Sequence, residues 1–292
     1  MLDRSVPIVM ETPRPGGLRA ALDALRGWQE DGAAVQLHPG DVGWFWRFGE
    51  ATTAAALRTW SRAGRPLAVG LLDGPRLLRL AIAPDAQDDG ALAHRIADDL
   101  QPGPGVLPPG EASVEARSGD LLRRVLVARG WVLDEPWTPL RRDLASQVED
   151  VGLRIEVAGP EHVDVRAAVQ RAAFPGSTFT PERWHAMAAG PAYADARCLV
   201  GHDAAGTAVA IATVWSAGPG RPGLLEPMGV HPDHRGRGHG LAITLAAAAA
   251  LRELGSSSAV VCTPSDNAGA VATYEAAGFV RQPESRDLRR AG

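Results

Sequence analysis

The feature that most constrains this 292-residue chain is a loop in which glycine recurs at every second position, at Gly236, Gly238 and Gly240. An apolar segment typical of a strand, 223–230, precedes the loop, and a segment typical of a long helix, 238–254, follows it. Glycines let the backbone approach a bulky anion, and the first turn of a helix offers free N–H groups and the positive end of the helix dipole. The pattern therefore predicts a strand–loop–helix unit that binds a pyrophosphate.

Two arginines in the loop, Arg235 and Arg237, add donors for charge-assisted hydrogen bonds to such an anion. A P-loop is excluded because its GxxxxGK[ST] motif needs a lysine and the chain contains none. The dinucleotide fingerprint is excluded because the spacing here is GxGxG and not GxGxxG. The alternative is a glycine-rich turn whose arginines are simply solvated.

A second motif begins at Asn267 and continues with Tyr274 and the pair Gly278–Phe279. The residues between Asn267 and Gly278 predict a helix over 268–277, with Gly278 at the position after a helix end that favours glycine. The two motifs together, Arg-x-x-Gly-x-Gly and N-x-x-A-x-x-x-Y-x-x-x-G-F, resemble those of the GNAT superfamily of N-acetyltransferases. The resemblance extends over residues 153–290.

This resemblance implies that acetyl-CoA is the co-substrate and that the second half of the chain binds it. The residues implied in binding are Met228, Gly229, Val230, Arg235, Gly236, Arg237, Gly238, His239, Gly240, Leu241, Asn267 and Tyr274. Main-chain groups of Met228 and Val230 would meet the pantetheine arm, and the N–H of Met228 or Gly229 would donate to the oxyanion. Asn267 would position the arm, and Tyr274 would protonate the departing thiolate. The alternative for Tyr274 is a side chain that only packs on the sheet.

Glu226 is the candidate general base. Two-residue alternation along a strand places it on the same face as Met228 and Val230. A carboxylate at this point resembles the one found in several small-molecule branches of the superfamily, where it would attract a cationic acceptor and take its proton through water. The alternative is a structural glutamate paired with an arginine.

The first half of the chain repeats the order of predicted elements found in the second half, which suggests duplication. We expect a mixed α/β fold of two tandem GNAT-like domains, 1–147 and 148–292, joined at the polar stretch 146–152. Each would have a central, mostly antiparallel sheet with helices on both faces. The elements predicted for the first half are helices over 17–30, 51–62, 90–100 and 119–128, and strands over 67–72, 76–83, 111–117, 131–134 and 139–144.

The first half has lost both motifs. The stretch 85–90, which corresponds to the phosphate loop, has no arginine and carries three aspartates, so it would repel a pyrophosphate. Leu126 stands four residues before Gly130, where the second half has Tyr274 before Gly278. We therefore expect this domain to bind no cofactor, in a tandem layout similar to that of mycothiol synthase. The aromatic segment 41–48 is expected to form a buried cluster, in the core or between domains, with one wall of the acceptor pocket as the alternative.

Composition limits the partners. The formal charge of −4 gives no general attraction to nucleic acid or an anionic membrane, and Met1–Thr12 lacks the apolar run of a signal peptide. Cys198 and Cys262 stand in apolar segments without a Cys/His cluster, which argues against zinc and fits a reducing cytoplasm. The histidines at 231, 234 and 239 lie on a turn and not on one helix face, so no metal is expected there.

The sequence thus predicts a cytoplasmic, acetyl-CoA-dependent N-acetyltransferase, monomeric or homodimeric. It would act on a small-molecule primary amine by direct transfer in a ternary complex, with Glu226 and Tyr274 as catalytic residues. One alternative is a mycothiol-synthase-like acetylation of an amino sugar conjugate. The other is a non-catalytic acyl-CoA sensor, which would need the phosphate loop but neither catalytic side chain.

Overall fold

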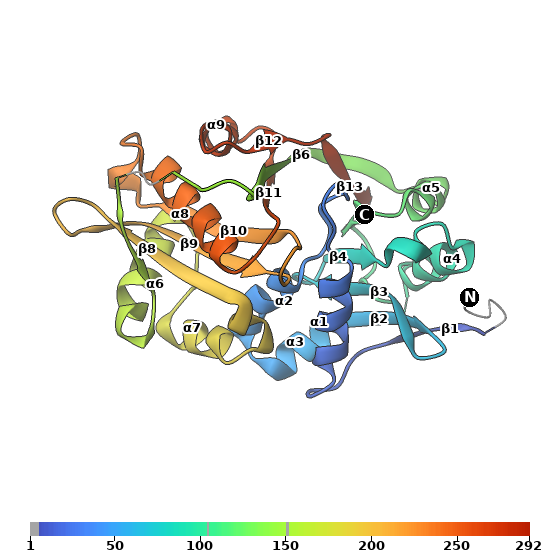
Figure 1. Cartoon of the computed structure of the whole chain (residues 1–292). Helices are drawn as coiled ribbons and strands as arrows, with labels where there is room; N and C mark the ends of the chain where they lie inside the picture. The colour runs from blue at the N-terminus through green and yellow to red at the C-terminus, as the bar shows by residue number, and fades with distance from the viewer. Residues whose placement is uncertain (1–5, 104, 150–151) are drawn as a thin grey trace. The chain divides into compact units, whose positions relative to one another are not determined.

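The computed structural model describes residues 6–103, 105–149 and 152–292. The chain forms two compact units (Figure 1). The N-terminal unit contains the chain up to His38, Glu50–Trp137 and Glu284–Gly292, and the C-terminal unit contains Pro39–Gly49 and Thr138–Pro283. Part of the predicted linker, Asp150 and Val151, lies outside the described residues. The predicted domains, 1–147 without a cofactor and 148–292 with acetyl-CoA, stay a prediction.

The sheet of the C-terminal unit is antiparallel except at one strand pair. Four strands pair in sequence order with alternating direction: β7 (Arg154–Val157), β8 (Ala196–His202), β9 (Ala208–Ser216) and β10 (Gly223–Val230). The next strand, β11 (Ser258–Pro264), runs parallel to β10 and is followed in the sheet by the end of β6 (Val132–Asp143). A short strand, β12 (Val280–Arg281), pairs with that end of β6.

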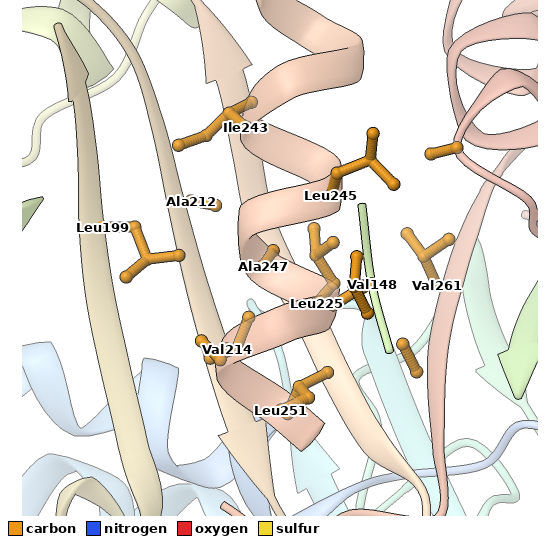
Figure 2. Packing of buried hydrophobic residues seen from close by; sticks show 14 of the residues in the cluster. Val148, Leu199, Ala212, Val214, Leu225, Ile243, Leu245, Ala247, Leu251 and Val261 are labelled. Carbon is orange, nitrogen blue, oxygen red and sulfur yellow. The ribbon is translucent and has the colours of Figure 1, made fainter. Parts of the chain in front are cut away.

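Helices cover both faces of this sheet. On one face, the long helix α8 (His239–Glu253) crosses β8, β9 and β10, and its apolar side chains interdigitate with those of the strands (Figure 2). Ile243, Ala247 and Leu251 pack there against Leu199 and Val214. The other face is covered by α6 (Val163–Ala173) and α2 (Pro39–Phe45), and α7 (Pro181–Ala188) packs against both of these helices. The helix after β11 is α9 (Ala268–Ala276).

The N-terminal unit has the same plan. Its antiparallel strands are β1 (Ile8–Glu11), β2 (Leu57–Arg62), β3 (Arg65–Leu72) and β4 (Leu77–Ile82), and β5 (Ala112–Glu115) runs parallel to β4. The last strand, β13 (Ser285–Arg290), pairs with β5 and with the start of β6. Its helices are α1 (Leu18–Gly27), α3 (Glu50–Ala56), α4 (Gly90–Asp99) and α5 (Asp120–Ala128). The expected fold class, a mixed α/β sheet with helices in a tandem arrangement, is confirmed.

Two predicted elements are wrong in part. The helix expected over 51–62 ends at Ala56, because Leu57–Arg62 forms a strand paired on both sides, with Trp60 fully buried. The strands expected over 131–134 and 139–144 form one continuous strand, β6. No sequence pattern predicted β1, β13 or α2. In the described part of the chain, no helix has both the length and the apolar character required to cross a membrane.

Candidate active site

The end of β10 has an open edge. β10 pairs with β9 as far as Val230, but it pairs with β11 only at Gly223 and Leu224, so the two parallel strands separate beyond that point. The His231 N–H donates to the Val209 carbonyl at 2.8 Å. Hydrogen-bonding directions alternate along an antiparallel strand. The main-chain N–H and carbonyl groups of Gly229 therefore point toward β9, whereas those of Met228 and Val230 point toward the open edge. Of the two oxyanion donors expected, this register favours the Met228 N–H.

The strand is irregular just before this edge. The register shifts between Leu225 and Met228, where three residue steps of β10 oppose two of β9. Leu225 and Met228 consequently both face α8, and the two-residue alternation used to place Glu226 is interrupted. That reasoning from alternation was wrong. The indole N–H of buried Trp215 donates to the Glu226 carbonyl at 2.8 Å and holds this irregular turn of the strand.

The glycine loop lies between β10 and α8. After a 3-10 turn at Pro232–His234, Gly236 and Gly238 adopt φ angles of 74° and 83°, in the left-handed region that favours glycine. Gly238 is the N-cap of α8 and provides no side-chain cap. The first hydrogen bond of the helix runs from the Ala242 N–H to the Gly238 carbonyl, so the N–H groups of the first turn remain available to an anion.

The two loop arginines have different environments. Arg235 donates from Nε to the Val230 carbonyl at 3.3 Å and from Nη2 to the Ala173 carbonyl at 3.0 Å, so it ties the loop to β10 and to the end of α6. Arg237 is exposed and makes no hydrogen bond or ion pair with any residue of 6–103, 105–149 or 152–292. Arg237 is therefore the loop guanidinium that is open to a ligand.

Gly240 lies where α8 packs against α9. A Cβ at this position would lie 3.2 Å from Thr273 Cγ2, so glycine lets the two helices pack together. Asn267 is the N-cap of α9, where its side-chain oxygen accepts a hydrogen bond from the Ala270 N–H at 3.2 Å. This capping role accounts for the Asn267 oxygen and leaves its amide N–H groups as the donors for any ligand.

Tyr274 lies on α9 and belongs to the core cluster that also contains the buried side chains of α8. Its side chain is buried against Phe279, and burial raises the pKa of the phenol far above its ordinary value. The Glu226 carboxylate raises that pKa further, and so, to a smaller extent, does Cys262 on β11. The Glu226 carboxylate therefore lies close enough to act on the pKa of Tyr274, and burial and this charge both favour the protonated phenol. The proximity of Cys262 was missed, because nothing local in its segment indicates which helix side chain faces it.

The aromatic segment 41–48 packs within the C-terminal unit. Trp44 stacks on Phe179 with ring centroids 5.2 Å apart, and the Arg47 guanidinium lies 4.4 Å from the Trp44 ring. Gly43 lies so close to Trp215 that a Cβ there would meet the indole at 2.4 Å. The expected core cluster is thus present. The sequence did not show that it supports Trp215, the residue that binds the Glu226 carbonyl.

The three loop histidines form a loose group. The rings of His231 and His234 are 5.5 Å apart, and those of His234 and His239 are 6.4 Å apart. The Asp203 Oδ2 atom lies 3.9 Å from His234 Nδ1. Within the residues that the structure describes, no three histidine, cysteine or acidic side chains are arranged to hold a metal ion.

Comparison with known protein families decides the class of this unit. Residues 167–279 match the acetyltransferase (GNAT) family, and this range contains β10, the glycine loop, α8 and Tyr274. This part of the chain is a GNAT acetyltransferase domain. This range contains the two motifs, one in the glycine loop and one from Asn267 to Phe279, on which the resemblance to the superfamily rests.

Solved structures resemble the whole chain at low sequence identity. A tandem GNAT protein from the clavulanic acid biosynthesis pathway has a TM-score of 0.59 and 16% identity over 97% of this chain and 98% of its own. An acetyltransferase of the GNAT family from Colwellia psychrerythraea has a TM-score of 0.56 and 16% identity over 97% and 98%. A GCN5-related N-acetyltransferase from Sphaerobacter thermophilus has a TM-score of 0.54 and 19% identity over 99% and 96%. At these identities the likeness shows the fold. No curated protein matches the chain.

Proposed function

We propose that the GNAT domain transfers the acetyl group of acetyl-CoA to a primary amine of a small molecule, directly and within a ternary complex. The observation that carries this proposal is the geometry at the end of β10, where the strand separates from β11 and leads through the glycine loop into the uncapped start of α8. Glu226 on this strand and Tyr274 on α9 supply one candidate acceptor and one candidate donor of protons, and the Met228 N–H supplies a main-chain donor. Together these are the groups that amine acetylation needs.

Acetyl-CoA fits the groups present. The N–H groups at the start of α8, left without a side-chain cap, and exposed Arg237 would bind the pyrophosphate. The open main-chain groups of Met228 and the N–H of Val230 would pair with the amide groups of the pantetheine arm, and the Asn267 amide would donate to it. When bound, the co-substrate supplies an acetyl thioester, and the Met228 N–H is the group placed to donate to the thioester oxygen.

Proton movements would couple the two catalytic side chains. An amine attacks only in its neutral form, so Glu226 would attract the ammonium form of the acceptor and take its proton. Protonation of Glu226 removes the negative charge that raises the Tyr274 pKa. Tyr274 therefore becomes a stronger acid at the stage when negative charge develops on the leaving sulfur.

The test is release of free CoA thiol from acetyl-CoA in the presence of a mixed amine library, with mass spectrometry to identify the acetylated product. Glu226→Gln and Tyr274→Phe should each lower turnover by roughly a hundred- to ten-thousandfold, the range of general acid–base contributions, with CoA affinity nearly unchanged. Glu275→Gln is the matched control, because Glu275 is an exposed carboxylate on α9 paired with Arg281 at 2.7 Å. Full activity of both catalytic variants would refute the assigned roles.

Two other outcomes are informative. Tight CoA binding without acetylation of any amine would favour the acyl-CoA sensor. Selective acetylation of an amino sugar conjugate would favour the mycothiol-synthase-like alternative, which rests on the tandem layout.

A further inference from the structure

The ends of β4 in the N-terminal unit and β10 in the C-terminal unit are built alike. Each strand leads through one residue into a proline and a 3-10 turn, Pro84–Ala86 in one case and Pro232–His234 in the other, and then into a helix. The Ala83 N–H donates to the Leu67 carbonyl, as the His231 N–H donates to that of Val209. By the same alternation, the main-chain N–H and carbonyl groups of Leu80 and Ile82 point away from β3, as those of Met228 and Val230 point away from β9.

In the N-terminal unit this edge is already filled. β4 pairs with β5 only from Leu77 to Arg79. Beyond Arg79, residues 36 and 37, which lie between α1 and α2, bind the free edge of β4. The Leu37 N–H donates to the Leu80 carbonyl at 3.4 Å, and the Ile82 N–H donates to Gln36 Oε1 at 3.2 Å. Gln36, Leu37 and His38 are all buried. Residues 36 and 37 therefore bind the Leu80 carbonyl and the Ile82 N–H, the two groups that would correspond to the Met228 carbonyl and the Val230 N–H.

Side chains fix this segment on both sides. Gln36 Oε1 also accepts a hydrogen bond from the hydroxyl of Ser118, which follows β5, and Gln36 Nε2 donates to the Trp28 carbonyl at 3.3 Å. The side chain of Gln29 donates to the Leu37 carbonyl at 3.1 Å. The segment thus bridges the edge of β4 and the chain after β5, and the side chain of Gln36 and the main chain of Leu37 are satisfied by these partners.

The N-terminus of α4, the helix after β4, is occupied by a side chain as well. Its N-cap is Asp89, whose carboxylate accepts a hydrogen bond from the Leu92 N–H at 3.0 Å and pairs with Arg62 at 2.6 Å. Arg62 and the backbone N–H groups hold the pKa of Asp89 below its ordinary value, so the cap is a carboxylate anion. The corresponding residue of the C-terminal unit is Gly238, which leaves the N-terminus of α8 without such a group.

We propose that the N-terminal unit retains an acyl-CoA groove that the chain itself occupies, with Gln36–His38 in place of the pantetheine arm and Asp89 in place of the pyrophosphate. The identity of the replaced ligand rests on the proposed function of the C-terminal unit. The occupant supplies the hydrogen bonds that a cofactor would make, so this unit is complete without a ligand and binds no CoA.

Amide hydrogen exchange on the full chain, followed with and without CoA, tests the proposal. In the absence of CoA, Leu37 and Ile82 should exchange slowly and Met228 and Val230 quickly. Saturating CoA should slow exchange at Met228 and Val230 and leave segment 77–83 unchanged. Gln36→Ala should speed exchange at Ile82 by about tenfold or more, because it removes the acceptor of a buried N–H. Gln101→Ala, which removes a side chain that donates to the Ala97 carbonyl, is the control.

The outcomes separate the two proposals. Slowing of segment 77–83 by CoA, or fast exchange of Ile82 without CoA, would overturn the self-occupied groove. Slow exchange of Ile82 together with no CoA effect at Met228 and Val230 would support the filled edge and contradict the cofactor assignment of the C-terminal unit. The comparison with and without CoA uses the unaltered protein, so it decides the question even if the Gln36 variant does not fold.

Discussion

Substitution of Gly43 by alanine should disturb the active site from the opposite face of the sheet. The new Cβ would stand 2.4 Å from Trp215 Cζ3 and 3.0 Å from the Ala192 Cβ. Restoring an ordinary contact of 3.4 Å requires the indole to move by about 1 Å. The indole N–H bonds the Glu226 carbonyl at 2.8 Å, and a shift of that size breaks the hydrogen bond or displaces Glu226 with it.

Two effects of different size follow. Overpacking at a buried contact should lower the free energy of unfolding by about 1–3 kcal/mol. Displacement of a catalytic carboxylate by about 1 Å should lower turnover by roughly ten- to a hundredfold, because the barrier depends on the alignment of the reacting groups. The affinity for CoA should change little, since the glycine loop is untouched.

Chemical denaturation, calorimetric CoA titration and steady-state kinetics of the variant measure the three quantities. Gly27→Ala is the control, because a Cβ there meets nothing within 4 Å in α1. Trp215→Phe removes the N–H donor without overpacking and should reproduce the loss of turnover. If Gly43→Ala loses stability but retains the turnover of the unaltered protein, Trp215 does not position Glu226 and the reasoning is wrong.

Two further predictions concern pH. Because burial and Glu226 raise the Tyr274 pKa, turnover should show no alkaline loss from tyrosine ionisation near pH 10, where an ordinary tyrosine titrates; a limb near pH 10 that disappears in Tyr274→Phe would contradict this. In the N-terminal unit, burial raises the pKa of Asp287 to about 6 despite Arg117 nearby. The folded state then holds a proton that the unfolded chain has lost, so the free energy of unfolding should fall as the pH rises from about 4 to about 6. Denaturation of Asp287→Asn should show a smaller fall, and an unchanged slope would refute the assignment.

The sequence predicted the parts of the site that are local. The glycine loop, the helix that follows it and the Asn267–Tyr274 helix each depend on neighbouring residues, so their spacing was sufficient to identify them. Arg235 was identified by the same spacing, but its bonds to two carbonyls, one of them 62 residues away, depend on how α6 packs and had no sequence signal.

Long-range pairing explains the remaining differences. Leu57–Arg62 has a composition compatible with a helix, and only pairing with β1 and β3 makes it a strand. The register shift before Met228 depends on a hydrogen bond between Trp215 and a carbonyl eleven residues away. The seating of Gln36 against Ile82 and Ser118 joins residues 46 and 82 positions apart, which no periodicity of the sequence can indicate.

Calorimetric titration with CoA of the unaltered protein, Gly238→Asp and Gly238→Asn tests whether the loop at the start of α8 binds the pyrophosphate of one acetyl-CoA per chain. Both variants place a side chain of nearly equal size at a φ of 83°, so their backbone strain is matched, and only the aspartate adds the negative charge that Asp89 provides in the other unit. We expect one site per unaltered chain. Binding should be at least about tenfold weaker in Gly238→Asp than in Gly238→Asn, because like charges meet at the helix N-terminus. Two sites per chain, or equal affinity of the two variants, would contradict this assignment.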